Sequence, residues 1–338
     1  MRAARPVHPR RAAAVAVRTL TVLAIAAITI RIGAHNVHQL RHIHIQLHPG
    51  WLAVAFVWTI ASALLLPLSW RALIWAYGFD LAPRTAVRIW CLSQGARYLP
   101  TGLAGFASRV VLASRAGVTR AVGAASWLLE FGLLILGGAT IASAALPSSV
   151  LPGPIRFVAF VTASIALALF PVGVATASRA SRRFPRLESI QSNRFDKRRG
   201  YFATGLYMSN AMAKACGSVV VTAAFFPVGR GDIALLLGAS AGAGVAGLVG
   251  ITPAGIGVRE AVLASILQPR FGLGDAAAIA VVLRAWDFGV ELVWLAVAVA
   301  MTRSTPPPTS GAGPSVDPSS RCLRESLPGE ATDSDLTA

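Results

Sequence analysis

Six long apolar segments determine whether this chain can fold in water or in a lipid bilayer. They lie at residues 15–34, 51–69, 121–146, 157–177, 201–226 and 276–301. A run of about 18 or more mostly uncharged residues predicts a helix that crosses a lipid bilayer. Because 55% of the residues are hydrophobic and only 13% are charged, the chain has too little polar surface for a water-soluble globule. The sequence therefore predicts an all-α polytopic membrane protein with about six spanning helices.

Basic residues gather in a few of the segments that connect these spans. Five arginines lie in residues 1 to 18, a second set lies between Arg71 and Arg120, and residues 179 to 199 hold eight basic and two acidic side chains. The positive-inside rule places these connections, and with them both termini, on the cytoplasmic side of the cell membrane. Attraction of the loop at 178–200 to anionic lipid headgroups is the alternative. The net charge of +17 does not predict a nucleic-acid partner, because no basic domain with interleaved aromatic residues lies outside the membrane region.

Two further apolar stretches, at 84–115 and 233–267, are interrupted by proline, and each predicts a re-entrant hairpin of broken helices. Each half of the chain then holds three spans and one hairpin. Since three is odd, the second half begins on the opposite side of the membrane, and the halves, at about 15–146 and 157–302, form an inverted repeat. The predicted domains are a basic cytoplasmic N-terminus at 1–14, a transmembrane domain at 15–302 and a disordered cytoplasmic tail at 303–338.

The two hairpins share a motif in which proline and glycine interrupt a helix and an arginine follows. The residues are Pro100, Gly102 and Arg109 in the first hairpin, and Pro253, Gly255, Gly257 and Arg259 in the second. A helix that restarts after such a break leaves its first backbone N–H groups unpaired, and hydrocarbon cannot satisfy them. A phosphate suits both these donors and the positive end of the helix dipole, so the motif predicts a substrate-binding anion site. The alternative is that the breaks are packing kinks.

Substitution of the second motif tests these alternatives. Alanine at both Pro253 and Gly255 is expected to let the helix run on and to close the free N–H groups into intrahelical bonds. The expected product is a folded but inactive protein.

The last predicted span carries an unusual set of charges. Arg284, Asp287 and Glu291 stand at positions i, i+3 and i+7, and therefore on one face of the helix. A charge inside a span costs at least ~2.5 kcal/mol, so these side chains are expected to face protein or a wet cavity and to pair. They form either a self-neutralising structural network or, together with Glu260, a substrate site in which an arginine releases its carboxylate when a phosphate arrives.

Two other spans hold a single charge each. Glu130 lies in the span at 121–146 and Lys214 in the span at 201–226. Both side chains are expected to pair across helices or to line the same cavity.

No residue pattern predicts a metal, a cofactor or a catalytic residue. Cys91, Cys216 and Cys322 are isolated and odd in number, so they suggest neither a disulfide framework nor a metal motif. Five histidines between residues 35 and 48 lack a fixed ligand spacing, which leaves Zn²⁺ binding as the weaker alternative there.

Three stretches carry a family resemblance: QGARYLPTG at 94–102, GFASR at 105–109, and TPAGIGVREA at 252–261, which is followed by Arg284 in the next span. They resemble the lysylphosphatidylglycerol synthase transmembrane region, a flippase-like family that also contains proteins described as dolichol-phosphate-glucose synthetases. The resemblance covers most of residues 15 to 302 and implies movement of a phospholipid or lipid-linked substrate between leaflets. In full-length synthases a separate cytosolic domain transfers the aminoacyl group. The stretch at 303–338 is too short for such a domain, so aminoacyl transfer is not expected.

These features together predict a carrier that binds and translocates a phospholipid or lipid-linked phosphate between leaflets. The alternative is a membrane-embedded glycosyl or lipid transferase, or a non-catalytic partner of one, with Glu260, Asp287 and Glu291 as the obvious candidate bases. Whether the protein is an enzyme stays open, although the lack of a recognisable catalytic motif favours a non-enzyme. The expected partner is a membrane lipid or lipid-linked substrate, and a second copy of the chain or a lipid-modifying enzyme is left open as a protein partner.

Overall fold

The computed structural model describes residues 46–96, 104–180, 195–250 and 255–303, and in these ranges every regular element is a helix. The helices are α3 (Pro49–Ser62), α4 (Leu65–Ala76), α5 (Pro83–Ala96), α6 (Ala104–Arg115), α7 (Arg120–Ala145), α8 (Gly153–Ala180), α10 (Lys197–Phe225), α11 (Asp232–Val249) and α12 (Val258–Arg303). The prediction of an all-α membrane protein is confirmed. The predicted first span, the N-terminus at 1–14 and the tail beyond residue 303 lie outside the described residues.

Length and composition identify four candidate membrane spans in the described part of the chain, at Pro49–Ala76, Arg120–Ala145, Gly153–Ala180 and Asp232–Val249. Three of them match predicted spans, while the fourth is α11, which the sequence assigned to a hairpin. The predicted spans at 201–226 and 276–301 are helical, as α10 and the second part of α12. They carry more charged side chains than the four candidates. The total number of spans therefore stays a prediction.

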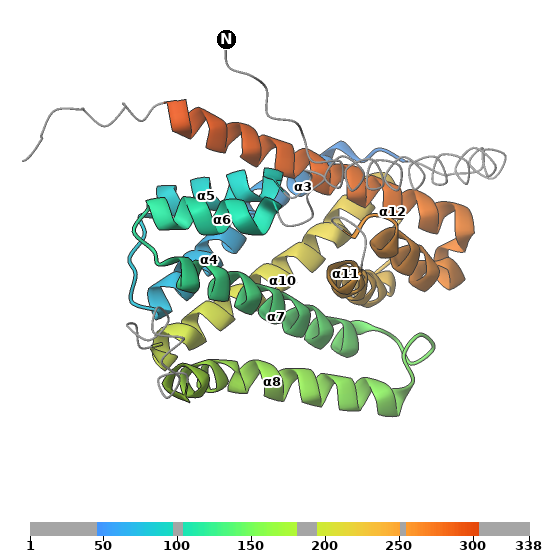
Figure 1. Ribbon diagram of the computed structural model, residues 1–338. Helices are drawn as coiled ribbons and strands as arrows, with labels where there is room; N and C mark the ends of the chain where they lie inside the picture. Colours follow the sequence, from blue (N-terminus) through green and yellow to red (C-terminus); the bar gives the residue numbers. More distant parts are fainter. Residues whose placement is uncertain (1–45, 97–103, 181–194, 251–254, 304–338) are drawn as a thin grey trace, which may run out of the picture.

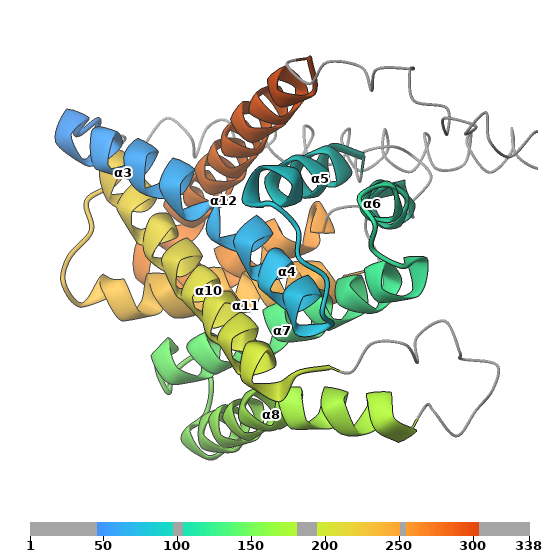
Figure 2. The ribbon, with the colours of Figure 1, turned by 90° about the vertical axis from the view of Figure 1, so that its left-hand side faces the viewer.

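The helices α3 and α4 run antiparallel to α10 along its whole length (Figure 2). At one end, the backbone N–H groups of Gln46 and His48 donate to the carbonyl groups of Phe225 and Ala224, each at 3.0 Å. At the other end, the N–H of Asp196 donates to the carbonyl of Ala76 at 2.8 Å. These bonds satisfy backbone groups outside the helices, so both ends of this pair are fixed.

Two pairs of shorter helices lie in the regions predicted as hairpins. The helices α5 and α6 pack against each other, and α11 packs against the first part of α12. The helix α12 is broken at Gly272, whose φ of 80° and ψ of 161° are not helical, and we call its parts the N-terminal segment (258–271) and the C-terminal segment (273–303). An ion pair of 2.6 Å between Arg270 and Asp232 joins the two outer ends of the second pair. Both ends of this pair therefore lie on the same side of the molecule.

The helices α7 and α11 cross closely because glycine lies at their contact. A Cβ atom on Gly138 would come within 2.6 Å of the Val245 side chain, and one on Gly238 within 2.8 Å of the backbone of Leu146. Small residues let two helix backbones approach in a membrane, where packing rather than the hydrophobic effect holds helices together. Gly138 and Gly238 therefore permit the close approach of α7 and α11.

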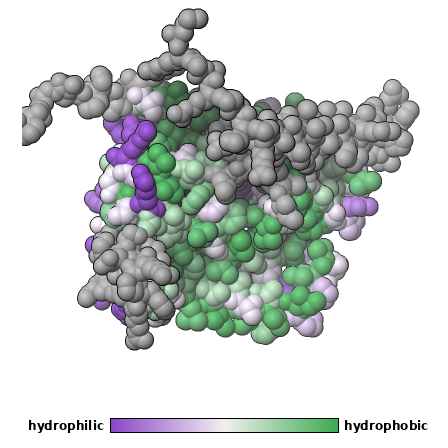
Figure 3. Space-filling view, viewed as in Figure 1, coloured by the Kyte–Doolittle hydropathy of each residue, from purple (hydrophilic) through white to green (hydrophobic). Residues whose placement is uncertain are grey.

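The surface separates apolar from charged residues. Large apolar side chains on α8, among them Ile155, Phe157 and Leu169, are more than half exposed, as expected of a helix that faces lipid. Hydrophilic side chains gather at the edge of the molecule seen on the left in Figure 3. The same edge holds the α4–α5 and α6–α7 connections, and the α7–α8 connection lies at the opposite edge (Figure 1). We call these the basic end and the opposite end.

The two ends should be reached by an impermeant thiol reagent from opposite sides of the membrane. In a background with the native cysteines replaced by alanine, Lys197→Cys marks the basic end, and Ser149→Cys marks the α7–α8 connection. The positive-inside rule predicts that Ser149→Cys reacts in intact cells and that Lys197→Cys reacts only after permeabilisation. Mass-tag labelling followed by gel shift measures both reactions. Labelling of both positions from the same side would contradict this topology.

Candidate functional site

The second hairpin and two long helices bring three charged side chains together. The Nη1 atom of Arg259, at the start of α12, lies 2.6 Å from Oδ2 of Asp287 in the C-terminal segment. The Nζ atom of Lys214 in α10 lies 3.8 Å from the same oxygen. Lys214 and Asp287 both stand near the middle of their helical segments, and therefore far from either end of the bundle. One carboxylate oxygen thus contacts two cations at the expected mid-depth of the membrane.

A second ion pair lies beside the first. The Nε atom of Arg284 is 3.5 Å from Oε1 of Glu260. The backbone N–H of Gly257 donates to the other oxygen of Glu260, Oε2, at 2.6 Å. This bond from the residue before the helix to a carboxylate three positions later is one half of a capping box. The helix therefore restarts at the predicted place, but the chain's own Glu260 occupies one of the N–H groups predicted to bind a substrate anion.

The charges of the last helix do not simply pair with one another along its face. Arg284 pairs with Glu260 and Asp287 with Arg259 and Lys214, so these ion pairs connect different helical segments. Glu291 follows Asp287 by four residues and contributes a third carboxylate to the same face. We define the mid-membrane cluster as the three cations and three carboxylates Lys214, Arg259, Arg284, Glu260, Asp287 and Glu291.

The mid-membrane cluster is accessible from outside the described helices. The side chain of Lys214 is 54% exposed, and those of Asp287 and Arg259 are 25% and 13% exposed. Charged groups at membrane depth are stable only where they face a partner or a water-filled cavity. The cluster therefore combines paired charges with partly exposed side chains, while the contacting oxygen Oδ2 of Asp287 is itself buried.

The arginine of the first hairpin lies in a closed environment instead. Arg109 in α6 donates from Nη1 to Oε1 of Glu130 in α7 at 2.8 Å, and from Nε to the hydroxyl of Ser93 in α5 at 3.0 Å. Tyr207 in α10 donates its hydroxyl to the second oxygen of Glu130 at 3.0 Å. The side chains of Arg109 and Glu130 are only 2% and 5% exposed.

Two indole rings complete this closed site. The guanidinium carbon of Arg109 lies 5.8 Å from the ring centre of Trp70 and 5.4 Å from that of Trp90. Such cation–π contacts stabilise a cation that has been removed from water. Every polar atom of the pair is thus directed at protein, and a role of Arg109 in substrate binding stays a prediction. The sequence predicted that Glu130 pairs across helices or lines a cavity. No sequence signal identified Ser93, Tyr207 or the two tryptophans as parts of this site.

The glycines of the second motif have a backbone role. Gly255 and Gly257 have φ angles of 68° and 88°, in the left-handed region that favours glycine. A Cβ atom on Gly255 would lie 2.6 Å from the carbonyl oxygen of Gly247 in α11. Alanine at position 255 therefore collides with backbone unless this segment moves, and the folded but inactive Pro253→Ala/Gly255→Ala variant stays a prediction. Pro100, Gly102 and Pro253 lie outside the described residues.

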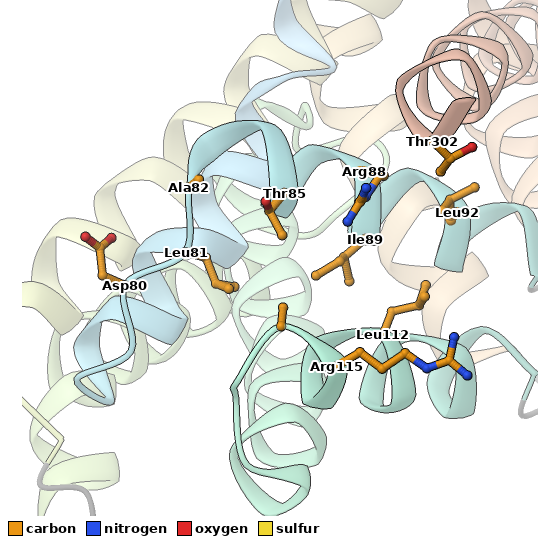
Figure 4. Close-up of a pocket in the computed structure, with 11 residues that line it drawn as sticks. Asp80, Leu81, Ala82, Thr85, Arg88, Ile89, Leu92, Leu112, Arg115 and Thr302 are labelled. Carbon is orange, nitrogen blue, oxygen red and sulfur yellow. The ribbon is translucent and has the colours of Figure 1, made fainter. Parts of the chain in front are cut away.

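A cavity of about 450 Å³ at the basic end is a second candidate site (Figure 4). Arg88 from α5 and Arg115 from α6 line it, together with Thr302 near the end of α12. Apolar side chains of Ile89 and Leu112 form another part of its wall. The carboxylate of Asp80 also lines the cavity, so its wall holds two cations and one anion beside the apolar side chains, which suits an amphipathic headgroup with an anionic group. Sequence reasoning missed it because neither arginine stands out from the other basic residues of this region.

Comparison with known proteins gives one match. The family model described as "Lysylphosphatidylglycerol synthase TM region" matches residues 13–295, which is most of the chain. No curated protein matches the sequence, and no solved structure matches it either.

The closed pair predicts a large and recoverable loss of stability. Glu130→Leu leaves Arg109 buried without a counter-charge and should lower the free energy of unfolding by about 3–5 kcal/mol. Adding Arg109→Leu removes the stranded charge and should restore most of that loss. Thermal unfolding of the purified protein in detergent measures both variants. Asp80→Ala, which removes an exposed pair with Arg71, is the control and should cost less than about 1 kcal/mol.

Two glycine substitutions should have opposite effects. Gly255→Ala combines a left-handed backbone, worth about 1–2 kcal/mol, with a backbone collision, and should lower the unfolding temperature. Gly244→Ala, in α11, meets nothing within 4 Å and should raise stability by up to about 1 kcal/mol through helix propensity. The same thermal assay compares them. Equal stability of the two variants would show that the close approach at Gly255 does not constrain the fold.

Proposed function

Because the chain belongs to the lysylphosphatidylglycerol synthase transmembrane-region family and is an integral membrane protein, we propose that it binds a phospholipid or lipid-linked phosphate and moves it between leaflets. The observation that carries the proposal is the mid-membrane cluster. Arg259 and Lys214 hold one carboxylate oxygen of Asp287 at a depth where a lipid phosphate would otherwise find no partner.

The neighbours of the hairpins support an inverted repeat. The helix α5 of the first hairpin packs against α12, the last helix of the second half, and α11 of the second hairpin packs against α7, the last helix of the first half. The helix pairs α4–α5 and α10–α11 are in contact in the same corresponding way. In carriers with inverted repeats, the substrate site lies near the midplane, where broken helices of the two halves meet. The mid-membrane cluster on α10 and α12, beside the broken helix of the second hairpin, supports such a site in the second half.

The basic end supplies a route to the cluster from one leaflet. We assign this end to the cytoplasmic side of the cell membrane because cations outnumber anions there. The cavity between α5 and α6 offers Arg88 and Arg115 to a headgroup at that surface. A headgroup would bind there first and reach Arg259 after the two halves move relative to each other. This sequence of two anion sites is typical of alternating access.

A membrane-embedded transferase is the alternative, and the ion pairs favour it less. A general base needs a carboxylate free to accept a proton from the reacting group. Glu260 accepts from the backbone of Gly257 and lies beside Arg284, while Asp287 is held by Arg259 and Lys214. These contacts suit exchange of one anion for another better than proton abstraction from a substrate.

Removal of the central cation should weaken binding of phosphate lipids. Arg259→Gln should reduce the affinity for phosphatidylglycerol by about 1.5–3 kcal/mol, or roughly 10- to 150-fold, the value of a hydrogen bond to a charged group. Lipid binding to protein in nanodiscs gives the affinity, and transfer of fluorescent phosphatidylglycerol in proteoliposomes gives the rate.

Two controls separate this effect from loss of structure. Arg230→Gln changes an exposed arginine of the α10–α11 connection and should bind normally. Diacylglycerol lacks the phosphate, so its movement should not depend on Arg259. If Arg259→Gln protein binds and moves phosphatidylglycerol like the unchanged protein, the proposed anion site is wrong.

A further inference from the structure

We propose that Asp287 is an internal substitute for the substrate phosphate, and that its release on lipid binding is coupled to the uptake of one proton. The inference rests on the proposed function, because it concerns the same cluster. It adds what that proposal leaves open, the energy source: the protein would carry an anionic lipid together with a proton.

A single carboxylate oxygen of Asp287 contacts two cations. Oδ2 of Asp287 lies 2.6 Å from Arg259 and 3.8 Å from Lys214, so one anionic oxygen faces two cations that come from different helices. A phosphate oxygen placed between the same cations would meet the same donors. Phosphate and Asp287 therefore compete for one place, and binding of the lipid requires the carboxylate to leave.

The charges of the mid-membrane cluster are balanced before a lipid binds. Asp287 faces Lys214 from α10 and Arg259 and Glu260 from the N-terminal segment of α12, with Arg284 and Glu291 on its own segment. Three cations balance three carboxylates, so the cluster is neutral without substrate. A phosphodiester brings one further negative charge, and an uncompensated charge is strongly disfavoured inside a membrane. One proton restores neutrality.

Asp287 is the group that takes up the proton. The displaced Asp287 loses its two contacting cations, Lys214 and Arg259, while Arg284, one turn away on its own helix, stays paired with Glu260, which also keeps the N–H of Gly257. The Asp287 side chain is 25% exposed, so its displaced carboxylate then accepts a proton from water and becomes a neutral carboxylic acid. When the lipid leaves, the acid returns that proton to water and the carboxylate binds Arg259 and Lys214 again. No other reactant is needed.

The pair in the first hairpin shows what a permanent ion pair looks like in this protein. Glu130 is held by Arg109 and by the hydroxyl of Tyr207, and both members of the pair are almost fully buried. Asp287 receives no comparable hydroxyl bond among the described residues, and its side chain is 25% exposed. The sequence builds a closed pair in one half and an open, exchangeable pair in the other.

Proton uptake on lipid binding can be measured directly. The full chain in detergent, in weakly buffered solution with a pH indicator dye, is titrated with short-chain phosphatidylglycerol, whose phosphodiester keeps one charge near neutral pH. We expect uptake of about one proton for each lipid bound. By linkage, a binding step that takes up one proton weakens by up to about tenfold for each unit that the pH rises.

Substitutions assign the proton to its carrier. Asp287→Asn should bind phosphatidylglycerol at least as tightly as the unchanged protein, take up no proton and lose the pH dependence. Asp287→Glu should keep proton uptake, because it retains a carboxylate. Asp275→Asn, the same change near the start of the same segment, is the matched control and should behave like the unchanged protein.

The outcomes distinguish the two proposals. Lipid binding to the unchanged protein without proton uptake overturns the coupling and leaves the proposed function intact. Proton uptake that persists in Asp287→Asn protein overturns the role of this residue. If the unchanged protein does not bind phosphatidylglycerol, both proposals fail. The first measurement needs no variant, so a variant that does not fold cannot decide the result.

Discussion

The need to pair every charge at membrane depth governs how this bundle is assembled. A stranded charge in hydrocarbon costs several kcal/mol, of the order of half the stability of many domains. The Arg109–Glu130 pair, with the Tyr207 hydroxyl, joins α6, α7 and α10 at one place. The Arg259–Asp287 pair joins the two segments of α12 and reaches α10 through Lys214. Helices that are far apart in the sequence are held in register by these few contacts.

Each half contains an arginine–carboxylate ion pair, but the two pairs differ in their surroundings. In the first half, aromatic rings and hydroxyl groups surround the ion pair, and its two side chains are almost fully buried. In the second half, the pair is accessible and its carboxylate is shared between two cations. The proposed lipid transport needs one part that keeps its shape and another that exchanges partners. The difference in exposure between Arg109 and Arg259 gives a physical basis for that division.

Much of the fold could be predicted from the sequence because hydrophobic length alone constrains membrane helices. The segments at 51–69, 121–146 and 157–177 fall within helices long and apolar enough to span. The helix restart near Gly257 was also predictable, since proline and glycine interrupt a helix by known mechanisms. The capping by Glu260 was missed, although a carboxylate three residues after a helix start is a recognisable signal.

The sequence by itself determined the membrane environment, the helical class and the family, and it predicted that Glu130 and Lys214 pair across helices or line the same cavity. It could not say which partner, because periodicity describes one helix at a time and charges pair across helices. Only the tertiary structure decided that Arg109 is closed off by Trp70 and Trp90 while the side chain of Asp287 stays partly exposed. Burial is a property of the packed bundle, and burial decides whether an ion pair is permanent or exchangeable.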